Sequence, residues 1–312
     1  MDQRNETLVA EFLLLGLTNL PHLQPFLFGI ILIVYIINML GNLTIVVIAI
    51  IEPRLHTPMY FFLGNLSFLD ICFSSVAVPK MLVNFLAQEP TISFAGCIAQ
   101  LHFFHFLGST EVLLLTAMSY DRYVAICNPL RYTTIMNCRV YVSLASSSWL
   151  MGFLHSMLHT VMTCRLTFCA SNEIKHFFCD IKPILRLACT DTHLNELLLS
   201  VVAGSLGMAS FLMTVLSYIS ISTFLLRIRS QEGRRKAFST CAAHLTVVVM
   251  LYGTALFTYV RPTTEASLEE DRVAAVLFTV VTPMLNPIIY TLRNEDVKRA
   301  LEKVKNRCLL PE

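Results

Sequence analysis

Two acidic residues, Asp70 and Glu111, interrupt long apolar stretches that are otherwise almost free of charge. An acid at the centre of a membrane costs about 2.5 to 3.5 kcal/mol on insertion scales, so such residues need a reason to be there. Together with Asn42 and Asn286, they can form a polar cluster that holds a sodium ion or water molecules. The alternative is that one acid is protonated and only donates a hydrogen bond to a neighbour.

A second group of residues that could take part in function is the triplet Asp121-Arg122-Tyr123. Arg122 is permanently charged, and Asp121 can hold it in an ion pair whose release exposes the guanidinium to a partner. By itself such a triplet is usually a solvated helix end, so its meaning depends on where the chain places it. Further along, Pro287 predicts a break in a helix, and Asn286 can satisfy the freed backbone groups.

The ten cysteines include no CxxC pair, which excludes a zinc knuckle and a thioredoxin motif. The segment from His176 to Asp180, and the histidines His102 and His105, offer soft metal ligands. Neither group has an evident tetrahedral ligand set. We therefore predict no metal and no cofactor.

The composition indicates that a membrane-embedded fold positions these residues. The chain has 312 residues, of which 55% are hydrophobic and only 14% are charged, whereas a soluble domain is about 25% charged. A surface that faces lipid explains the deficit. The net charge of +2 is too small for the footprint of a nucleic-acid partner, so we expect none.

Long uncharged segments define the expected helices. A hydrocarbon core about 30 Å thick needs roughly 20 apolar residues in a helix. Five segments of that length have no charge, and two more are interrupted by Asp70 and Glu111. The sequence predicts an all-α membrane protein, a bundle of seven transmembrane helices at about 26–50, 58–79, 93–127, 140–164, 197–226, 237–260 and 273–292.

The basic residues predict the orientation of this bundle. Fifteen of the 23 lysine and arginine residues fall on one side, which should be cytoplasmic. Residues 1–25 then form an extracellular segment, residues 26–292 the membrane domain and residues 293–312 a cytoplasmic tail. A glycosylation sequon at Asn5 lies on the predicted outer side. Four cysteines share that side, and sequence alone allows three pairings among them: Cys97, Cys169, Cys179 and Cys189.

The tail carries a further helical pattern. Val297, Leu301 and Val304 have helical spacing among basic residues in 294–307. This spacing predicts a short amphipathic eighth helix on the inner membrane surface, with a solvated basic helix as the alternative. Cys308 is either palmitoylated or a free thiol.

Four motifs, in order and on the expected helices, narrow the class of protein. They are Leu55-His56-Thr57-Pro58-Met59-Tyr60-Phe61-Phe62, Met118-Ser119-Tyr120-Asp121-Arg122-Tyr123-Val124-Ala125-Ile126-Cys127, Lys236-Ala237-Phe238-Ser239-Thr240-Cys241 and Pro283-Met284-Leu285-Asn286-Pro287-Ile288-Ile289-Tyr290. With these motifs the chain resembles the rhodopsin-like G-protein-coupled receptors and, among them, the odorant (olfactory) receptors of tetrapod class II type. The departures are Ser119 for the usual Ala, and Ala242-Ala243 for Ser-Ser before His244.

The resemblance implies roles for several of these residues. Arg122 would engage the G protein, and Tyr218 and Tyr290 would turn inward as the sixth helix swings out. The polar cluster around Asp70 would rearrange on activation. The resemblance also implies two disulfides, Cys97 with Cys179 and Cys169 with Cys189.

A ligand region is expected in the outer half of the bundle. Helical spacing places five residues of the third helix on one face, and the resemblance turns that face toward the pocket, opposite the fifth, sixth and seventh helices. Plain helix packing explains any single member equally well. The set is Phe104, His105, Gly108, Ser109, Val112, Val202, Leu206, Tyr252, Ala255, Leu256, Tyr259 and Thr279.

This set describes a small, mostly apolar cavity that suits a neutral or weakly polar molecule. Amine ligands are disfavoured, because the outer end of the third helix lacks the acid that amine receptors of this fold carry. We expect a plasma-membrane receptor for a small odorant, which activates a stimulatory, olfactory-type heterotrimeric G protein and raises cyclic AMP. Trafficking helper proteins are expected partners.

Two other classes of membrane protein would carry different sequence features. A transporter would show inverted repeats and paired broken helices, and the odd number of spans without repeats argues against it. An intramembrane enzyme would need paired catalytic groups at one depth, for which Asp70 and Glu111 are the sole candidates. We therefore predict that the protein is not an enzyme.

Overall fold

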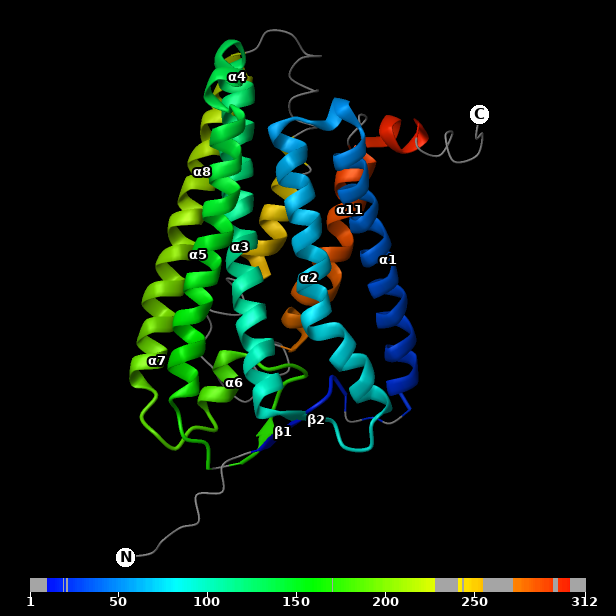
Figure 1. Cartoon of the computed structure of the whole chain (residues 1–312), viewed down its shortest axis with the longest axis vertical. Helices are drawn as coiled ribbons and strands as arrows, with labels where there is room; N and C mark the ends of the chain where they lie inside the picture. Colours follow the sequence, from blue (N-terminus) through cyan, green and yellow to red (C-terminus); the bar gives the residue numbers. More distant parts are fainter. Residues whose placement is uncertain are drawn as a thin grey trace, which may run out of the picture.

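The computed structural model describes residues 10–18, 20, 22–169, 171–227, 241–242, 244–254, 272–293 and 297–303. These residues form a bundle of long helices that run roughly along its long axis (Figure 1). The long helices of the first half are α1 (Gln24–Ile51), α2 (Pro58–Leu86), α3 (Phe94–Cys127) and α5 (Cys138–Cys164). In the second half, α7 (His193–Leu198), the π-helical segment η3 (Leu199–Ala203) and α8 (Gly204–Arg227) follow without a break.

The remaining long helices complete the bundle. The sixth predicted span is described as helix over His244–Thr254, and the seventh runs over Arg272–Tyr290. The seventh contains the π-helical segment η4 (Leu277–Val281) and leads into α11 (Thr282–Arg293). Among the described residues, five helices are both long and apolar enough to cross a membrane. The architecture is the seven-helix membrane bundle that the sequence predicts.

Two helices depart from the simple apolar pattern. Helix α5 has 27 residues, about 40 Å at 1.5 Å per residue, but its serines and histidines lower its hydropathy. Helix α2 continues to Leu86 although the sequence predicts an end near Pro79. Gln100 Nε2 donates to the carbonyl oxygen of Val76 at 2.9 Å. Such side-chain bonds compensate backbone groups near a proline, so the helix can pass through it.

Helix α3 is the central helix and packs against α2, α5 and α8. At Gly152 of α5, an added Cβ would lie 2.9 Å from the carbonyl oxygen of Phe106 and 3.0 Å from the amide nitrogen of Thr110. A glycine is therefore required for α3 and α5 to approach so closely. Large apolar side chains such as Ile33, Leu150 and Leu216 remain exposed on the outside of the bundle, as a surface in contact with lipid requires.

A small sheet closes one end of the bundle, and the all-helical expectation did not include it. Strands β1 (Glu11–Leu14), β2 (Thr91–Ser93) and β3 (Glu173–Ile174) have the spatial order β2-β1-β3. Strand β1 pairs antiparallel with β2 and parallel with β3. Phe12 and Leu14 point from β1 into a second core with Phe168 and Ile174. The N-terminal segment is thereby tied to the long loop after α5.

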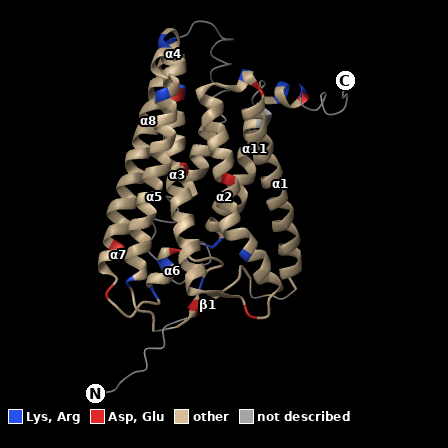
Figure 2. Ribbon diagram, viewed as in Figure 1, with Lys and Arg blue, Asp and Glu red and all other residues tan. Residues whose placement is uncertain are grey.

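The opposite end carries η1 (Pro53–Leu55), η2 (Pro129–Arg131), α4 (Tyr132–Ile135) and a helix at 297–303. Within the predicted tail helix, the described residues 297–303 are helical, with Val297 and Ala300 buried and Lys298 exposed. Lys303 Nζ lies 2.8 Å from Glu52 Oε2, and this contact lowers the pKa of Glu52. Figure 2 shows charged residues gathered mainly at the two ends of the bundle, with few between them. Asn5, Val304 and Cys308 lie outside the described residues.

Candidate functional site

The structure brings the predicted polar cluster together between four helices. Asp70 and Glu111 are both buried, and they lie close enough to interact electrostatically. Asn286 Nδ2 donates to Asp70 Oδ2 at 2.8 Å, and Asn42 Nδ2 donates to the carbonyl oxygen of Pro283 at 3.0 Å. The network therefore connects α1, α2, α3 and α11 at the level of the two acids.

Two further polar residues, which the sequence analysis missed, extend this network. Asn42 Nδ2 also lies 2.6 Å from Asn38 Oδ1, and Asn38 Nδ2 donates to Ser74 Oγ at 2.6 Å. The spacing of Asn38 and Asn42 by four residues places them on one face of α1, which is the signal that could have included Asn38.

The cluster keeps unused acceptor oxygens. One side-chain oxygen of each member has no hydrogen-bond partner among the described residues: Asn42 Oδ1, Asp70 Oδ1, Glu111 Oε1 and Asn286 Oδ1. Carboxylate and amide oxygens are ligands for hard cations, and buried water satisfies such atoms equally well. Elsewhere in the described ranges, no three His, Cys, Asp or Glu side chains are grouped to hold a metal ion.

At the C-terminal end of α3, Arg122 is held by its neighbour. Arg122 Nη2 lies 3.0 Å from Asp121 Oδ2, and the hydroxyl of Tyr132 donates to Asp121 Oδ1 at 2.8 Å. Burial and the adjacent Asp121 raise the pKa of Tyr132, so its hydroxyl keeps the proton that it donates. Tyr132, in the short helix α4, was not predicted as a member of this site.

At the same end of the bundle, side-chain contacts join α8 to the sixth span. The hydroxyl of Tyr218 and Nδ1 of His244 are 2.6 Å apart, and the two rings stack with centroids 5.9 Å apart. Tyr123 packs beside them against a small apolar cluster that includes Ile221 and Cys241. Tyr290 is buried, and its hydroxyl has no hydrogen-bond partner within the described part of the chain. Of the two predicted switch tyrosines, Tyr218 is thus hydrogen-bonded to the sixth span, whereas Tyr290 shares the main core cluster with Val247 and Leu251 of that span.

The break predicted at Pro287 is not present, because α11 continues through Pro287 to Arg293 and Asn286 Nδ2 donates to Asp70 instead of to the backbone. Pro287 faces α1. A Cβ added at Gly41 would lie 3.0 Å from Pro287 Cγ, so a glycine allows α1 and α11 to meet here. The structure therefore places Asn286 and Pro287 side by side at the point where α11 contacts both α1 and Asp70.

In the half of the bundle next to the small sheet, aromatic side chains surround the predicted ligand residues of α3. The ring of Phe104 lies 4.6 Å from that of Phe178 and 5.2 Å from that of Phe73. Phe73 in turn contacts Phe278, at 5.0 Å. Gly108 adjoins the same group, because an added Cβ would lie 3.7 Å from Phe73. Phe104 and Gly108 were predicted as ligand residues, whereas Phe73, Phe178 and Phe278 were not.

His105 joins this region to the long loop after α5. His105 Nε2 lies 3.0 Å from Asp180 Oδ1, and both residues are buried. Burial alone would raise the pKa of Asp180, but the hydrogen bond and charge of His105, together with His176 and the backbone bond from Ile181, outweigh it and lower that pKa. Asp180 also accepts a hydrogen bond from its neighbour Ile181 N at 2.7 Å. The acid that contacts the predicted ligand residue His105 is therefore already paired.

Ser109 turns toward α5 rather than toward the aromatic rings. Its hydroxyl lies 2.9 Å from His155 Nδ1, and the ring of His155 lies 4.7 Å from that of His159. Nε2 of both histidines is buried without a hydrogen-bond partner in the part of the chain that the structure describes. Their spacing of four residues in an apolar span was the sequence signal for this pair.

The other predicted ligand residues have less distinctive surroundings. Val112 packs against the main core, and Tyr252 contacts Phe211 with ring centroids 5.3 Å apart. The hydroxyl of Thr279 donates to the carbonyl oxygen of Ala275 in its own helix, at 2.7 Å. Val202 and Leu206 are half-buried, Val202 in η3 and Leu206 in α8. Ala255, Leu256 and Tyr259 lie outside the described residues.

The loop over this region is held by the two disulfides that the resemblance implied. They are Cys97–Cys179, with Cα atoms 5.4 Å apart, and Cys169–Cys189, with Cα atoms 5.9 Å apart. Between them, His176 is buried and stacks on Phe177 with ring centroids 4.8 Å apart. Burial lowers the pKa of His176 to about 4. The loop also contains the short helix α6 (Ile181–Leu185), so it is an ordered lid.

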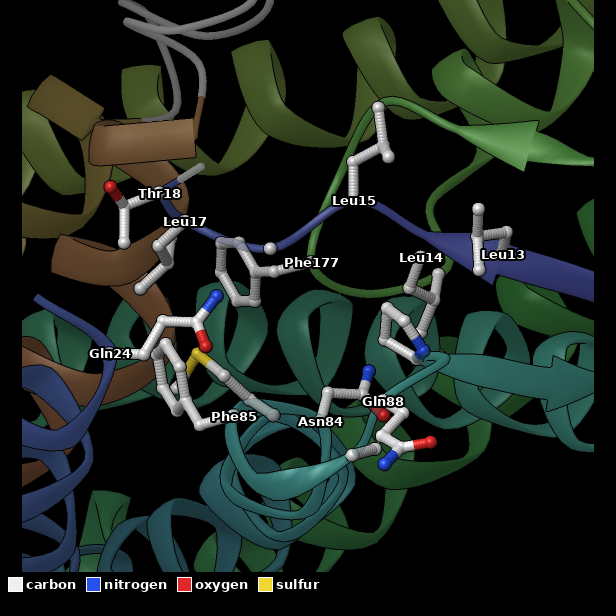
Figure 3. A pocket seen from close by; sticks show the side chains of 14 residues that line it. Leu13, Leu14, Leu15, Leu17, Thr18, Gln24, Asn84, Phe85, Gln88 and Phe177 are labelled. Carbon is white, nitrogen blue, oxygen red and sulfur yellow. The ribbon is translucent and has the colours of Figure 1, made fainter. Parts of the chain in front are cut away.

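A cavity of about 290 Å³ lies beside this lid (Figure 3). Its walls come from the N-terminal segment, the end of α2, the loop that follows α2, and Phe177 of the lid. None of the predicted ligand residues lines it. The sequence analysis did not anticipate this cavity, because β1 places the N-terminal segment over α2 only through tertiary pairing.

The similarity of this chain to known proteins extends over nearly its whole length. A family model described as "Olfactory receptor" matches residues 31–307. The chain is 56% identical over 309 residues to olfactory receptor 12D1 of Homo sapiens, covering 99% of this chain and 97% of that protein. It is 52% identical over 308 residues to olfactory receptor 5T17 of Mus musculus, covering 99% and 95%.

Proposed function

Because the chain belongs to the olfactory receptor family, we propose that it binds a small, mostly apolar odorant inside the helix bundle and activates a stimulatory G protein of the olfactory type. It is a multi-pass membrane receptor and not an enzyme. The observation that carries the proposal is the whole-length match. It spans the outer end, where an odorant would bind, and the inner end, where Arg122 would meet the G protein.

The ligand half of the proposal places the odorant beside Phe104, His105 and Gly108. The aromatic rings around Phe104 offer apolar contact, and the lid closes over them through the His105–Asp180 pair. Because Asp180 is engaged by His105, this region favours a neutral ligand over an amine. A ligand of about 10 to 15 heavy atoms, at under roughly 1 kcal/mol per atom, should bind with micromolar affinity. Weak binding permits fast release.

The signalling half of the proposal concerns the inner end. In this arrangement Arg122 is paired with Asp121, and the Tyr218–His244 contact keeps the sixth span close to α8. An odorant that prefers the active state would shift the population toward release of Arg122 and an outward movement of the sixth helix. The polar cluster around Asp70 would rearrange in the same step, with a sodium ion or water on its free oxygens. The outcome is a rise in cyclic AMP.

The proposed orientation has the N-terminus outside the plasma membrane. Both disulfides and β1 lie at one end of the bundle, and disulfides form in the oxidising exterior. Arg54, Arg131 and Arg139 belong to elements at the opposite end, as the positive-inside rule requires of the cytoplasmic face. Glycosylation at Asn5 and trafficking helper proteins belong to the same proposal.

The test is a cyclic AMP reporter screen with a chemically diverse odorant panel. Cells would express the receptor, trafficking helpers and the olfactory-type stimulatory G protein. We expect at least one odorant to raise cyclic AMP, and Arg122→Ala to abolish that response because the guanidinium is lost. Lys298→Ala, which removes an exposed cation of the tail, is the control.

Surface expression of both variants must match that of the parent. A full response from Arg122→Ala at equal surface expression would contradict the coupling role. Silence of the parent with every odorant and with every class of G protein would contradict the receptor proposal itself.

A further inference from the structure

The side chain of Gln100, in α3, forms hydrogen bonds with two other elements at once. Its Nε2 donates to the carbonyl oxygen of Val76 in α2 at 2.9 Å, and its Oε1 accepts from the backbone N of Cys179 in the lid at 2.8 Å. Gln100 is 7% exposed and Cys179 is fully buried, so solvent has little access to these bonds. Turning the amide over would place its amino group against an N–H and its oxygen against a carbonyl. The amide therefore has one orientation that satisfies both partners.

Gln100 is one of several α3 residues that hold the lid. Cys97, Gln100 and Phe104 are spaced by three and four residues, so they lie on one face of α3. Cys97 forms the disulfide with Cys179, and the ring of Phe104 lies 4.6 Å from that of Phe178. A disulfide accepts Cα separations from about 4.4 to 6.8 Å, so it leaves the orientation of the Cys179 backbone open. The hydrogen bond from Cys179 N to Gln100 removes that freedom.

The two lid residues next to Cys179 in the sequence contact predicted ligand residues. The ring of Phe178 lies against that of Phe104, and Asp180 Oδ1 lies 3.0 Å from His105 Nε2. Both side chains therefore extend from the backbone on either side of Cys179. Since the hydrogen bond at Cys179 N holds this backbone, it sets the positions of both side chains over the predicted ligand region.

The second bond of the amide ties the lid to α2 near its internal proline. Val76 lies three residues before Pro79, which has no N–H to donate within the helix. Three residues earlier in α2, Phe73 belongs to the aromatic group around Phe104, with ring centroids 5.2 Å apart. The same amide thus connects the lid, α3 and the part of α2 that borders the predicted ligand region.

We propose that Gln100 is a positioning residue for the ligand site, because it holds the lid in the place where Phe178 and Asp180 reach α3. It acts through the lid and α2 and not through contact with the ligand. Loss of its amide leaves the disulfide intact but frees the backbone around Cys179, so the aromatic wall of the site loosens. The inference rests on the proposed function, since the ligand region is part of that proposal.

The test is fluorine NMR of the purified, full-length receptor in lipid nanodiscs, with 4-fluorophenylalanine in place of Phe178. Phe104→Leu removes the neighbouring ring and identifies the change in chemical shift that reports this contact. Gln100→Met keeps the length of the side chain and removes both hydrogen bonds, so we expect it to move the resonance in the same direction. Gln88→Met makes the same exchange at an exposed position and should leave the resonance unchanged.

Gln100→Glu separates the positioning role from a general effect on the fold. Its carboxyl group keeps an acceptor oxygen for Cys179 N, so the resonance of the label at Phe178 should stay near its parent position. Hydrogen exchange gives the magnitude. The amide of Cys179 should exchange about fivefold faster in Gln100→Met, the ratio expected for one hydrogen bond, and near the parent rate in Gln100→Glu.

Both variants are compared at thermal unfolding that matches the parent. Should Gln100→Met not fold, Gln100→Asn, whose side chain is one methylene too short to reach both partners, takes its place. An unmoved resonance with an unchanged Cys179 amide in Gln100→Met would overturn the proposal, and so would equal effects of Gln100→Met and Gln100→Glu.

The consequence for the ligand is measured with an odorant from the screen. Gln100→Met should raise the concentration that gives a half-maximal response without lowering the maximal response, because the contacts of Arg122 are unchanged. The fluorine and exchange measurements need no odorant, so a failure of this proposal is distinguishable from a failure of the proposed receptor function.

Discussion

At the scale of single residues, buried histidines determine much of the chemistry of the outer end. His105 pairs with Asp180, His155 contacts Ser109, and His176 lies inside the lid between aromatic rings. A neutral imidazole can be buried at low cost, whereas the protonated ring requires a partner. His176 is the clearest case, because burial holds its pKa at about 4 and the charged groups that act on it are Asp180 and Arg272.

The burial of His176 predicts that low pH destabilises the closed lid. The folded pKa of His176, about 4, lies below the usual value of 6.5, so the opened loop binds more protons between pH 6.5 and 4. The contribution of the neutral His176 ring to the stability of the lid is therefore complete at neutral pH, and it is lost as the pH falls from 6.5 to 4. Between pH 7 and pH 5 the loss should be about 2 kcal/mol of local opening free energy.

Hydrogen exchange of residues 171–190 at pH 7 and pH 5, corrected for intrinsic rates, measures this effect. His176→Phe keeps the stacked ring and removes the titrating group, so the lid of this variant should lose much less stability over the same range. Asp180 does not explain a change in this window, because its lowered pKa keeps it ionised there. Equal pH dependence in the parent and His176→Phe would refute the assignment.

At the scale of elements, the close approach of α3 and α5 rests on one glycine. A side chain at Gly152 would collide with backbone atoms of Phe106 and Thr110, which cannot move without displacing α3. By contrast, Gly207 in α8 has nothing within 4 Å of an added Cβ. The same substitution should therefore have opposite effects at the two positions.

We expect Gly152→Ala to destabilise the receptor by about 1 to 3 kcal/mol, the range for an overpacked interior. Gly207→Ala should be neutral or stabilising by up to about 1 kcal/mol, since alanine favours the helix. Thermal unfolding in detergent, with binding of a ligand from the odorant screen as the test of folding, compares the two. A Gly152→Ala protein as stable as Gly207→Ala would show that α3 and α5 are not packed as described.

At the scale of the whole molecule, contacts at the inner end restrain the proposed activation. Tyr218 of α8 and His244 of the sixth span are joined by a short hydrogen bond and by ring stacking. Arg122 is meanwhile paired with Asp121 and so is not free for a partner. Because the proposed ligand region lies in the other half of the bundle, a ligand bound there would have to shift both contacts through the helices themselves.

His244→Phe should raise basal cyclic AMP, because it keeps the stacked ring and removes the hydrogen bond. A net loss of about 1 kcal/mol from the resting state would increase the active population about fivefold while it remains a minor one. Thr246→Val is the control, since its hydroxyl bonds within its own helix and faces outward. Unchanged basal activity of His244→Phe at matched surface expression would argue against this restraint.

The membrane class, the approximate positions of the helices and four members of the polar network follow from the sequence alone. Apolar length, helical spacing and isolated acids such as Asp70 are local properties of a chain, so they are visible without a structure. The motif around Arg122 and the resemblance that it carries indicated the family, which the whole-length comparison confirmed. The disulfide pairing came from the resemblance, because four cysteines alone leave three choices.

Which side chains meet across elements is visible only in the folded structure. His105 pairs with Asp180, Asp121 with Tyr132, and Tyr218 with His244. In each pair the two residues lie far apart in the sequence or on different elements. Their contacts depend on the rotation of each helix and on the path of the loops, which no local pattern specifies. The same holds for β1 and the cavity beside the lid, since a four-residue strand acquires its position from β2 and β3 and not from its own sequence.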